Sequence, residues 1–171
     1  MDGLRGCVYT VITASDVLRS IGALLAERGL VGRGQRFRAE WPELAWMVEL
    51  EVVPKTGRVG IYLGICPVGL ATGGWPSRAN DCPIVLHPPS GTLLGVDYWR
   101  SWKALDAESE MDDQDRRAAL ADLCDAMTDR AMRVTTLADL RRLEMEGHLS
   151  GFVHKDARAL LRGGETTNAD G

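Results

Sequence analysis

Three side chains that could carry out chemistry lie close together in the sequence, namely Asp81, Cys82 and His87. A histidine can act as a general base, a cysteine thiolate is a nucleophile, and all three residue types bind metal ions. Their spacing matches neither the paired cysteines of a zinc motif nor the G-x-S-x-G turn of a hydrolase. We therefore predict no catalytic residue, no metal ligand and no cofactor, and keep a small-molecule or metal-dependent enzyme centred on these residues as an alternative.

The densest charge in the sequence is a run of six carboxylates within ten residues: Asp106, Glu108, Glu110, Asp112, Asp113 and Asp115. Its last members coincide with the start of a predicted helix, where the helix dipole stabilises negative charge. Capping alone would explain them. The alternative is a surface for a basic partner, because like charges held on one face speed association with a complementary patch.

A second charged surface is the outer face of a predicted sheet, where Glu49 and Glu51 follow a strand that carries Arg36 and Arg38. Cross-strand ion pairs on a solvated face are the simpler interpretation, and an anionic ligand or acidic partner is the other. The loop from residue 67 to 81 contains Trp75 and exceeds the roughly 12 residues that compact domains usually tolerate without a functional reason. We predict a protein partner that contacts Glu49, Glu51, Trp75, Asp106, Glu108, Glu110, Asp112 and Asp113.

The elements that position these residues follow from hydrophobic periodicity. Apolar residues at helical spacing predict helices over residues 14–28, 112–133, 135–147 and 155–162. Thr13, with Asp16 three residues later, predicts a capping box at the start of the first helix. Alternating apolar residues predict strands over 35–41, 45–53 and 58–65, with a fourth strand at 84–86. The aromatic-rich segment 92–102 is expected to continue the sheet before it becomes helical. The glycines of 29–34 lie between helix and strand, the wrong context for a phosphate loop, and predict a flexible link.

These elements predict an α+β fold. We expect an antiparallel sheet of about four or five strands, covered on one face by helices, and a helical C-terminal part. With 171 residues, one domain over residues 1–162 is expected, followed by a disordered polar tail over 163–171. The segment 7–12 is β-branched and apolar, and is compatible with a short strand or an added helical turn.

Composition narrows the class of protein. The net charge is −4, and residues 101–171 carry 15 acidic against 10 basic residues, which disfavours binding to nucleic acid. No apolar window is long enough for a membrane span, and the first residues do not resemble an export signal, so we expect a cytoplasmic protein that does not contact membranes. In that compartment the four widely spaced cysteines, Cys7, Cys66, Cys82 and Cys124, are expected to be reduced.

The order of features resembles a bacterial domain family of unknown function. The residues that carry the resemblance are the basic segment Gly32-Arg33-Gly34-Gln35-Arg36-Phe37, the strand end Tyr62-Leu63-Gly64-Ile65, the pair Asp81-Cys82, and the segment 98–102. The similarity spans about residues 14–145. The chain departs from the family at Leu30-Val31, where the family is aromatic, and at Pro83, where a larger polar residue is common.

The resemblance implies a function that composition alone does not. Domains of this kind are found beside contact-dependent or secreted toxins, where they look like immunity proteins that bind and block a cognate toxin. Our leading hypothesis is therefore a non-enzymatic protein-binding domain that neutralises a toxin with a basic surface. Besides the enzyme, a third hypothesis is a structural subunit of a larger assembly, which exposed Trp41, Trp75 or Trp102 would support.

Overall fold

The computed structural model describes residues 12–163, which form a six-stranded antiparallel sheet and five α-helices. In chain order the elements are α1 (Ala14–Glu27), β1 (Val31–Arg33), β2 (Arg36–Glu40), β3 (Leu44–Val53), β4 (Arg58–Pro67), the 3-10 helices η1 (Val68–Leu70) and η2 (Ala79–Asp81), β5 (Ile84–Leu86), α2 (Tyr98–Leu105), α3 (Asp113–Arg133), α4 (Leu137–Met145), β6 (Phe152–Val153) and α5 (Lys155–Arg162). The predicted α+β class and helical C-terminal part are confirmed. The predictions for the segment 7–12 and for the tail 163–171 fall almost wholly on residues outside this range, since only Ile12 and Gly163 of them are described.

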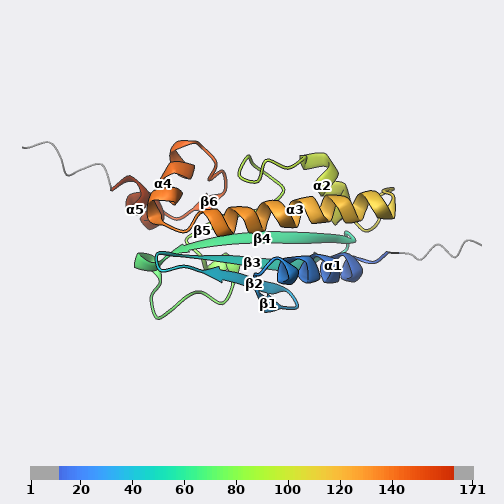
Figure 1. Cartoon of the computed structure of the whole chain (residues 1–171), viewed down its shortest axis with the longest axis horizontal. Coiled ribbons are helices and arrows are strands. Elements are labelled where there is room, and N and C mark those ends of the chain that lie inside the picture. The colour runs from blue at the N-terminus through green and yellow to red at the C-terminus, as the bar shows by residue number, and fades with distance from the viewer. Residues whose placement is uncertain (1–11, 164–171) are drawn as a thin grey trace, which may run out of the picture.

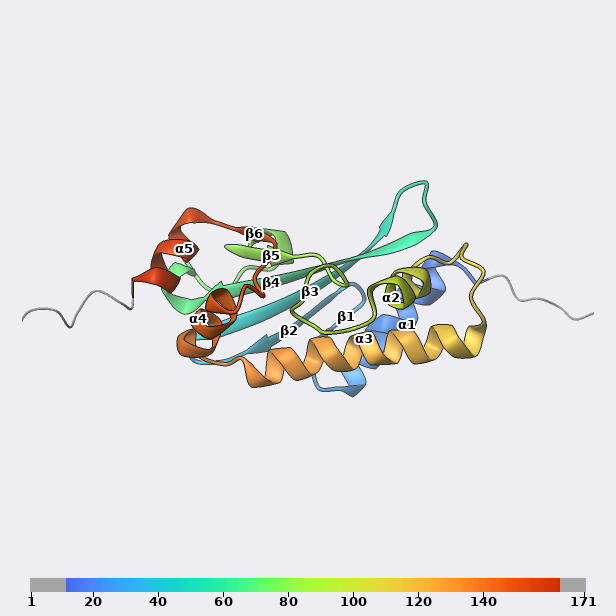
Figure 2. The same ribbon diagram turned by 90° about the horizontal axis from the view of Figure 1, so that it is seen from above.

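The strands lie in sequence order across the sheet, from β1 to β6, and each pair is antiparallel. The long hairpin β3–β4 is the centre of the sheet and projects beyond the rest of the molecule (Figure 2). Its register places apolar residues opposite one another on one face: Trp46 faces Ile65, Val48 faces Leu63, and Leu50 faces Ile61. The alternation in sequence therefore predicts the buried face correctly.

Helices cover this apolar face. The long helix α3 runs along the sheet, with α2, α4 and α5 on the same side, and α1 packs against α3 and the first strands (Figures 1 and 2). Val17 and Ile21 of α1 and Leu123 of α3 join the strand residues in one continuous core. Trp46 is fully buried there and donates its indole N–H to the carbonyl oxygen of Val134 at 2.8 Å. The polar atom of this large side chain is thus satisfied.

Side chains fix where the helices begin. Thr13 and Asp16 form the predicted capping box of α1, and Asp112 caps α3 by accepting from the backbone N–H of Gln114 at 2.7 Å. In α4 the hydroxyl of Thr136 accepts from the N–H of Asp139, while the Asp139 carboxylate accepts from the N–H and hydroxyl of Thr136. Such caps satisfy backbone donors that the first helical turn leaves without a partner.

The α4 cap makes stability depend on pH. The hydrogen bond from Thr136 lowers the pKa of the Asp139 carboxyl, so the folded state favours its ionised form. The stabilisation is complete above the ordinary aspartate pKa of about 3.9 and is lost as pH falls through the lower folded value. We expect Asp139→Asn to cost about 1 kcal/mol in urea unfolding at pH 7 and progressively less as pH is lowered below about 3.9. A cost that stays the same as pH is lowered would contradict this assignment.

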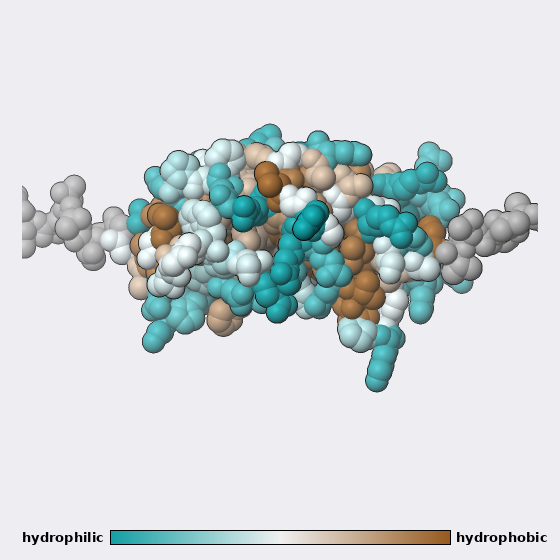
Figure 3. All heavy atoms as spheres, turned by 90° about the horizontal axis from the view of Figure 1, so that it is seen from below, coloured by the Kyte–Doolittle hydropathy of each residue, from teal (hydrophilic) through white to brown (hydrophobic). Residues whose placement is uncertain are grey.

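The opposite face of the sheet is covered in part by the segment from η1 to η2. Ala79 and Cys82 pack there against Met47 and Cys66 in a second, smaller apolar cluster. Gly64 of β4 makes this close packing possible, because a Cβ at this position would lie 2.6 Å from the carbonyl oxygen of Ala79. Seen from this side the surface is mainly hydrophilic, with hydrophobic residues in small patches (Figure 3).

Three parts of the fold differ from the predictions. The segment predicted as a flexible link contains β1, the edge strand, and β6 is a two-residue strand that no pattern indicated. Residues 92–97, expected to extend the sheet, form no strand, and the helix expected after them is α2, which Asp97 caps by accepting from the N–H of Arg100 at 2.8 Å. Local capping outweighs the strand propensity of its aromatic residues. No helix within residues 12–163 is long and apolar enough to cross a membrane.

Candidate functional site: an acidic end of the molecule

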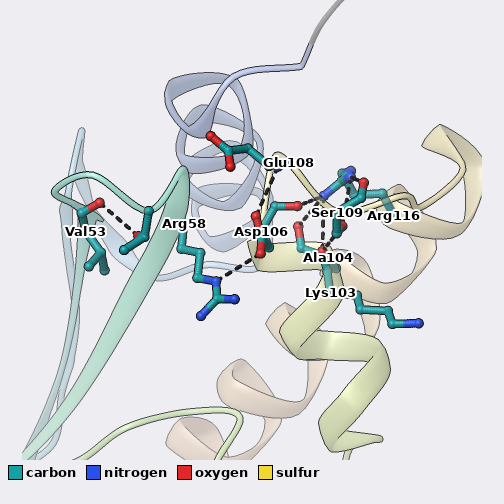
Figure 4. A network of polar contacts seen from close by, with 9 residues as sticks. Val53, Arg58, Lys103, Ala104, Asp106, Glu108, Ser109 and Arg116 are labelled. Atoms are coloured by element: carbon teal, nitrogen blue, oxygen red, sulfur yellow. Dashed lines mark hydrogen bonds and ion pairs between the residues drawn. The ribbon is translucent and has the colours of Figure 1, made fainter.

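The carboxylates predicted to form a surface connect α2 to α3 at one end of the molecule, beside the β3–β4 hairpin (Figures 1 and 4). We call residues 106–112 the acidic loop, and the acidic loop together with α2, the hairpin tip and the first turn of α3 the acidic end. The conformation of the acidic loop is fixed by contacts to α2, to α3 and to the hairpin.

Arg116 of α3 holds the acidic loop from inside. Its side chain is buried, with 4% of the residue exposed. It donates to the carbonyl oxygens of Lys103, Ala104 and Asp106 at 3.2, 3.1 and 2.6 Å, and to the carbonyl and hydroxyl oxygens of Ser109 at 3.1 and 3.2 Å (Figure 4). These carbonyls include the last ones of α2, where the helix dipole favours a cation.

The hairpin holds the acidic loop from the other side. Arg58 of β4 donates to the Asp106 carboxylate at 2.9 Å, and its guanidinium lies 5.0 Å from the centre of the Trp102 ring. The N–H of Ala107 donates to the carbonyl oxygen of Gly57 at 3.0 Å. Asp106 is therefore neutralised within the molecule, and it orients the acidic loop instead of presenting a free charge to a partner.

The other carboxylates of the run face solvent. Glu108, Glu110, Asp112, Asp113 and Asp115 are exposed, and within residues 12–163 none of the five forms an ion pair. Asp112 is also occupied by capping α3. The structure thus brings these predicted residues together on one fixed surface whose charge is available to a partner.

Aromatic side chains lie on α2, the helix that leads into the acidic loop. Trp99 is 68% exposed and Tyr98 is 39% exposed, and their rings meet edge to face with centres 5.0 Å apart. Tyr98 also stacks on Trp102 at 6.1 Å, and Trp102 in turn lies beside Arg58. Sequence reasoning missed this cluster, because it did not place the start of the helix within 92–102; the helical spacing of Tyr98 and Trp102 was the available signal.

A mostly apolar cavity of about 290 Å³ opens between α2, β4 and the loop that follows β5. Its walls include Tyr62 and Ile61 of β4, Trp102 of α2, and His87 and Ser90 of the loop. The Tyr62 hydroxyl donates to the Glu51 carboxylate, which raises the pKa of Tyr62 and keeps the phenol protonated. Glu51 therefore does not line this cavity itself, but it holds the Tyr62 side chain that does.

Glu49 and Trp75 lie elsewhere, on the face covered by the η1–η2 segment. The expectation that Glu49 is exposed is wrong: it is 7% exposed, lies 3.4 and 3.2 Å from the Nε atoms of Arg36 and Arg78, and accepts from the N–H of Ala79 at 3.1 Å. The alternation of apolar and polar residues along β3 placed Glu49 on the correct face of the sheet. The η1–η2 segment that buries it there is remote in sequence, so its burial could not be predicted. Trp75 is half-buried against the Cys66–Cys82 cluster.

The three residues of the enzyme hypothesis do not converge on one cavity. His87 lines the cavity beside Trp102, whereas Asp81 and Cys82 line a different one that includes His154 and Asp156. Burial raises the pKa of the Cys82 thiol to about 12, so it is protonated at neutral pH and is a poor nucleophile. Within residues 12–163 no three His, Cys, Asp or Glu side chains gather in a way that could hold a metal ion.

This burial predicts unreactive thiols. Cys66, Cys82 and Cys124 are all buried and free, and burial raises the pKa of each. In a Cys7→Ser variant, which removes the cysteine outside the described residues, we expect Ellman's reagent to label no thiol of the folded protein at pH 7 and three thiols in urea. Rapid labelling of one thiol in the folded state would contradict the assigned burial.

Comparisons of the chain with protein-family models, with curated proteins and with solved structures found no match. The site must therefore be interpreted from its own geometry. The tryptophans proposed as assembly contacts give little support to a structural subunit, because Trp41, Trp75 and Trp102 are each only partly exposed, and Trp41 donates to the carbonyl oxygen of Ala131 at 3.0 Å.

Proposed function

We propose that this protein is a non-enzymatic binding protein that docks through its acidic end onto a protein with a basic surface. The observation that carries the proposal is the exposure of Trp99 on α2, the helix that leads into an acidic loop whose exposed carboxylates form no ion pair within residues 12–163. Exposed tryptophan and tyrosine are the residues that most often anchor protein interfaces. Surrounding charge of one sign steers a complementary partner and excludes others.

The rigidity of the acidic end supports the same function. Hydrogen bonds from Arg116, together with the Arg58–Asp106 pair, hold the acidic loop without a partner present. A loop that is ordered before binding loses less conformational entropy when it docks. Together with the resemblance to toxin-associated domains, this leads us to propose an immunity protein of the cytoplasm whose partner is a basic toxin domain.

The test is co-expression with the products of neighbouring genes, followed by affinity measurement on any complex. We expect Trp99→Ala to weaken binding at least tenfold, about 1.4 kcal/mol. Phe152→Ala is the matched control, because Phe152 is 60% exposed but lies on β6, away from the acidic end. The proposal fails if no neighbouring product binds or protects cells, or if both variants bind alike.

Charge-reversing substitutions distinguish long-range electrostatic attraction of the partner from direct contact with it. Glu108→Lys with Glu110→Lys should slow association at least tenfold at low salt, and the difference should shrink as salt is raised. The control pair is Glu144→Lys with Glu146→Lys at the end of α4, which changes the net charge equally. Equal slowing by both pairs would mean that net charge, not the acidic end, attracts the partner.

A further inference from the structure

The outer edge of β4 contains a gap in its pairing that is one residue long, at Ile61. On one side of the gap Leu63 begins the pairing with β5, and on the other Arg58 forms an isolated bridge with the acidic loop. Extending the β4–β5 register by two residues would place Pro88 opposite Ile61, and a proline has no N–H to donate. The gap is too short for another strand, but a small molecule needs no more than one residue.

The hydrogen-bond pattern shows which groups face this gap. The N–H of Leu50 donates to the carbonyl oxygen of Gln35 at 2.8 Å, so the even-numbered residues of β3 bond toward β2. The odd-numbered residues of β3 then bond toward β4, and the register pairs them with the even-numbered residues of β4. The N–H and C=O of Ile61 consequently both point away from β3, into the gap. A residue placed in this way exchanges two hydrogen bonds with a single partner.

Burial makes the unpaired backbone of Ile61 informative. The residue is 3% exposed, and within residues 12–163 no group outside β3 forms a hydrogen bond with its N–H or C=O. Buried backbone groups are almost always hydrogen-bonded. The cavity of about 290 Å³ adjoins this residue, and its volume is close to the lower limit of roughly 300 Å³ for small-molecule sites. The geometry therefore favours a ligand that brings one donor and one acceptor.

The walls of the cavity favour a flat and uncharged ligand. Tyr62, His87 and Trp102 line it, and aromatic side chains pack well against planar rings. Of the described residues in the walls, Arg58 is the one that carries a permanent charge, and the carboxylate of Asp106 lies 2.9 Å from its Nε (Figure 4). Because this charge is already offset, an ionic ligand would gain little from it.

We propose that this cavity binds an uncharged planar heterocycle through the backbone of Ile61. The ring must carry an N–H beside a C=O, because these two groups together donate to the Ile61 C=O and accept from the Ile61 N–H, as one residue of a neighbouring strand would. The pyrimidinedione ring of uracil has this edge. The site goes beyond the proposed docking function, since it needs no protein partner.

Two uracil derivatives test the proposal, with the full chain isotopically labelled for NMR. 1-Methyluracil keeps the ring N–H between two C=O groups, whereas 1,3-dimethyluracil lacks this donor and exposes more apolar surface. We expect 1-methyluracil to bind with a dissociation constant of about 1 mM and to shift the amide resonance of Ile61. The dimethyl control should bind at least tenfold more weakly.

The control is decisive because apolar burial alone predicts the opposite order. If 1,3-dimethyluracil binds as tightly as 1-methyluracil, or more tightly, the cavity accepts flat rings without using the backbone of Ile61, and the proposal is wrong. It is also wrong if saturating 1-methyluracil leaves the Ile61 amide unchanged.

A pair of protein variants locates the ligand. Ser90→Trp fills the cavity from the loop that follows β5 and should weaken binding of 1-methyluracil at least tenfold. Ser77→Trp is the matched control, because Ser77 is also an exposed serine but lines a groove beside β1 and β2. Equal binding by the two variants would place the ligand outside this cavity.

Uridine distinguishes a free base from a nucleoside as the natural ligand, because it carries a ribose in place of the methyl group of 1-methyluracil. At least tenfold tighter binding of uridine than of 1-methyluracil assigns the site to a nucleoside, and weaker binding assigns it to a free heterocycle. In both cases 3-methyluridine, which lacks the ring N–H, should bind at least tenfold more weakly than uridine. Equal affinities of these two nucleosides would contradict recognition through Ile61.

Discussion

Arg116→Ala is expected to lower the free energy of unfolding by about 3 kcal/mol. The substitution removes five hydrogen bonds and leaves the buried carbonyl oxygen of Ala104, in the last turn of α2, without its donor. It also removes the cation that the C-terminus of α2 favours. Urea unfolding at pH 7, followed by circular dichroism, measures the change.

Arg117→Ala is the matched control, because the neighbouring arginine is exposed and bonds only to the carbonyl oxygen of Asp113 in its own helix. Its cost should stay within about 0.5 kcal/mol. Arg116→Lys should recover only part of the loss, since one ammonium group cannot reach both sets of carbonyls that the guanidinium fork reaches. If Arg116→Ala proves as mild as Arg117→Ala, the acidic loop is held by other contacts.

Gly64→Ala is expected to cost about 2 kcal/mol and to detach η2 from the sheet. The added methyl group would lie 2.6 Å from both the carbonyl oxygen of Ala79 and the sulfur of Cys82, closer than atoms can approach. Because backbone is among the atoms contacted, a rotamer change cannot relieve the clash. The displacement should also break the hydrogen bond from the N–H of Ala79 to Glu49.

Gly60→Ala tests whether this cost is specific to the close approach. Gly60 lies on the same strand and face, but a methyl group there would meet only side chains, of Glu51 and Val53, at 3.3 Å. These can shift, so the change should stay within about 0.5 kcal/mol. Comparable destabilisation by both substitutions would indicate a general intolerance of β4 to side chains instead of contact with η2.

Much of the fold could be predicted because its signals are local. The capping box at Thr13 marked the start of α1, and alternation from Trp46 to Leu50 identified the face that the helices cover. The short strands β1 and β6 could not be found in this way. With three and two residues they carry no period, and their partners in the sheet define them.

The candidate site was predictable in charge but not in geometry. The carboxylate run is visible in the sequence. Asp106 nevertheless differs from the other carboxylates, because it is neutralised by Arg58, which lies 48 residues earlier in the chain. The same holds for Glu49, whose burial depends on Arg78 and Ala79 in a segment without periodicity. Pattern assigns a residue to a face, whereas long-range contacts decide whether that face meets water.

The order of the strands has a consequence for how the chain folds. Strands β1 to β5 are neighbours in both sequence and sheet, so most of their pairings close short loops. The pairing of β5 with β6 instead closes a loop that contains α2, α3 and α4. Because the entropy of closing a loop grows with its length, the meander should assemble first and β6 should join late. Translation favours the same order, since the ribosome releases α1 and the meander before the helices α2 to α5.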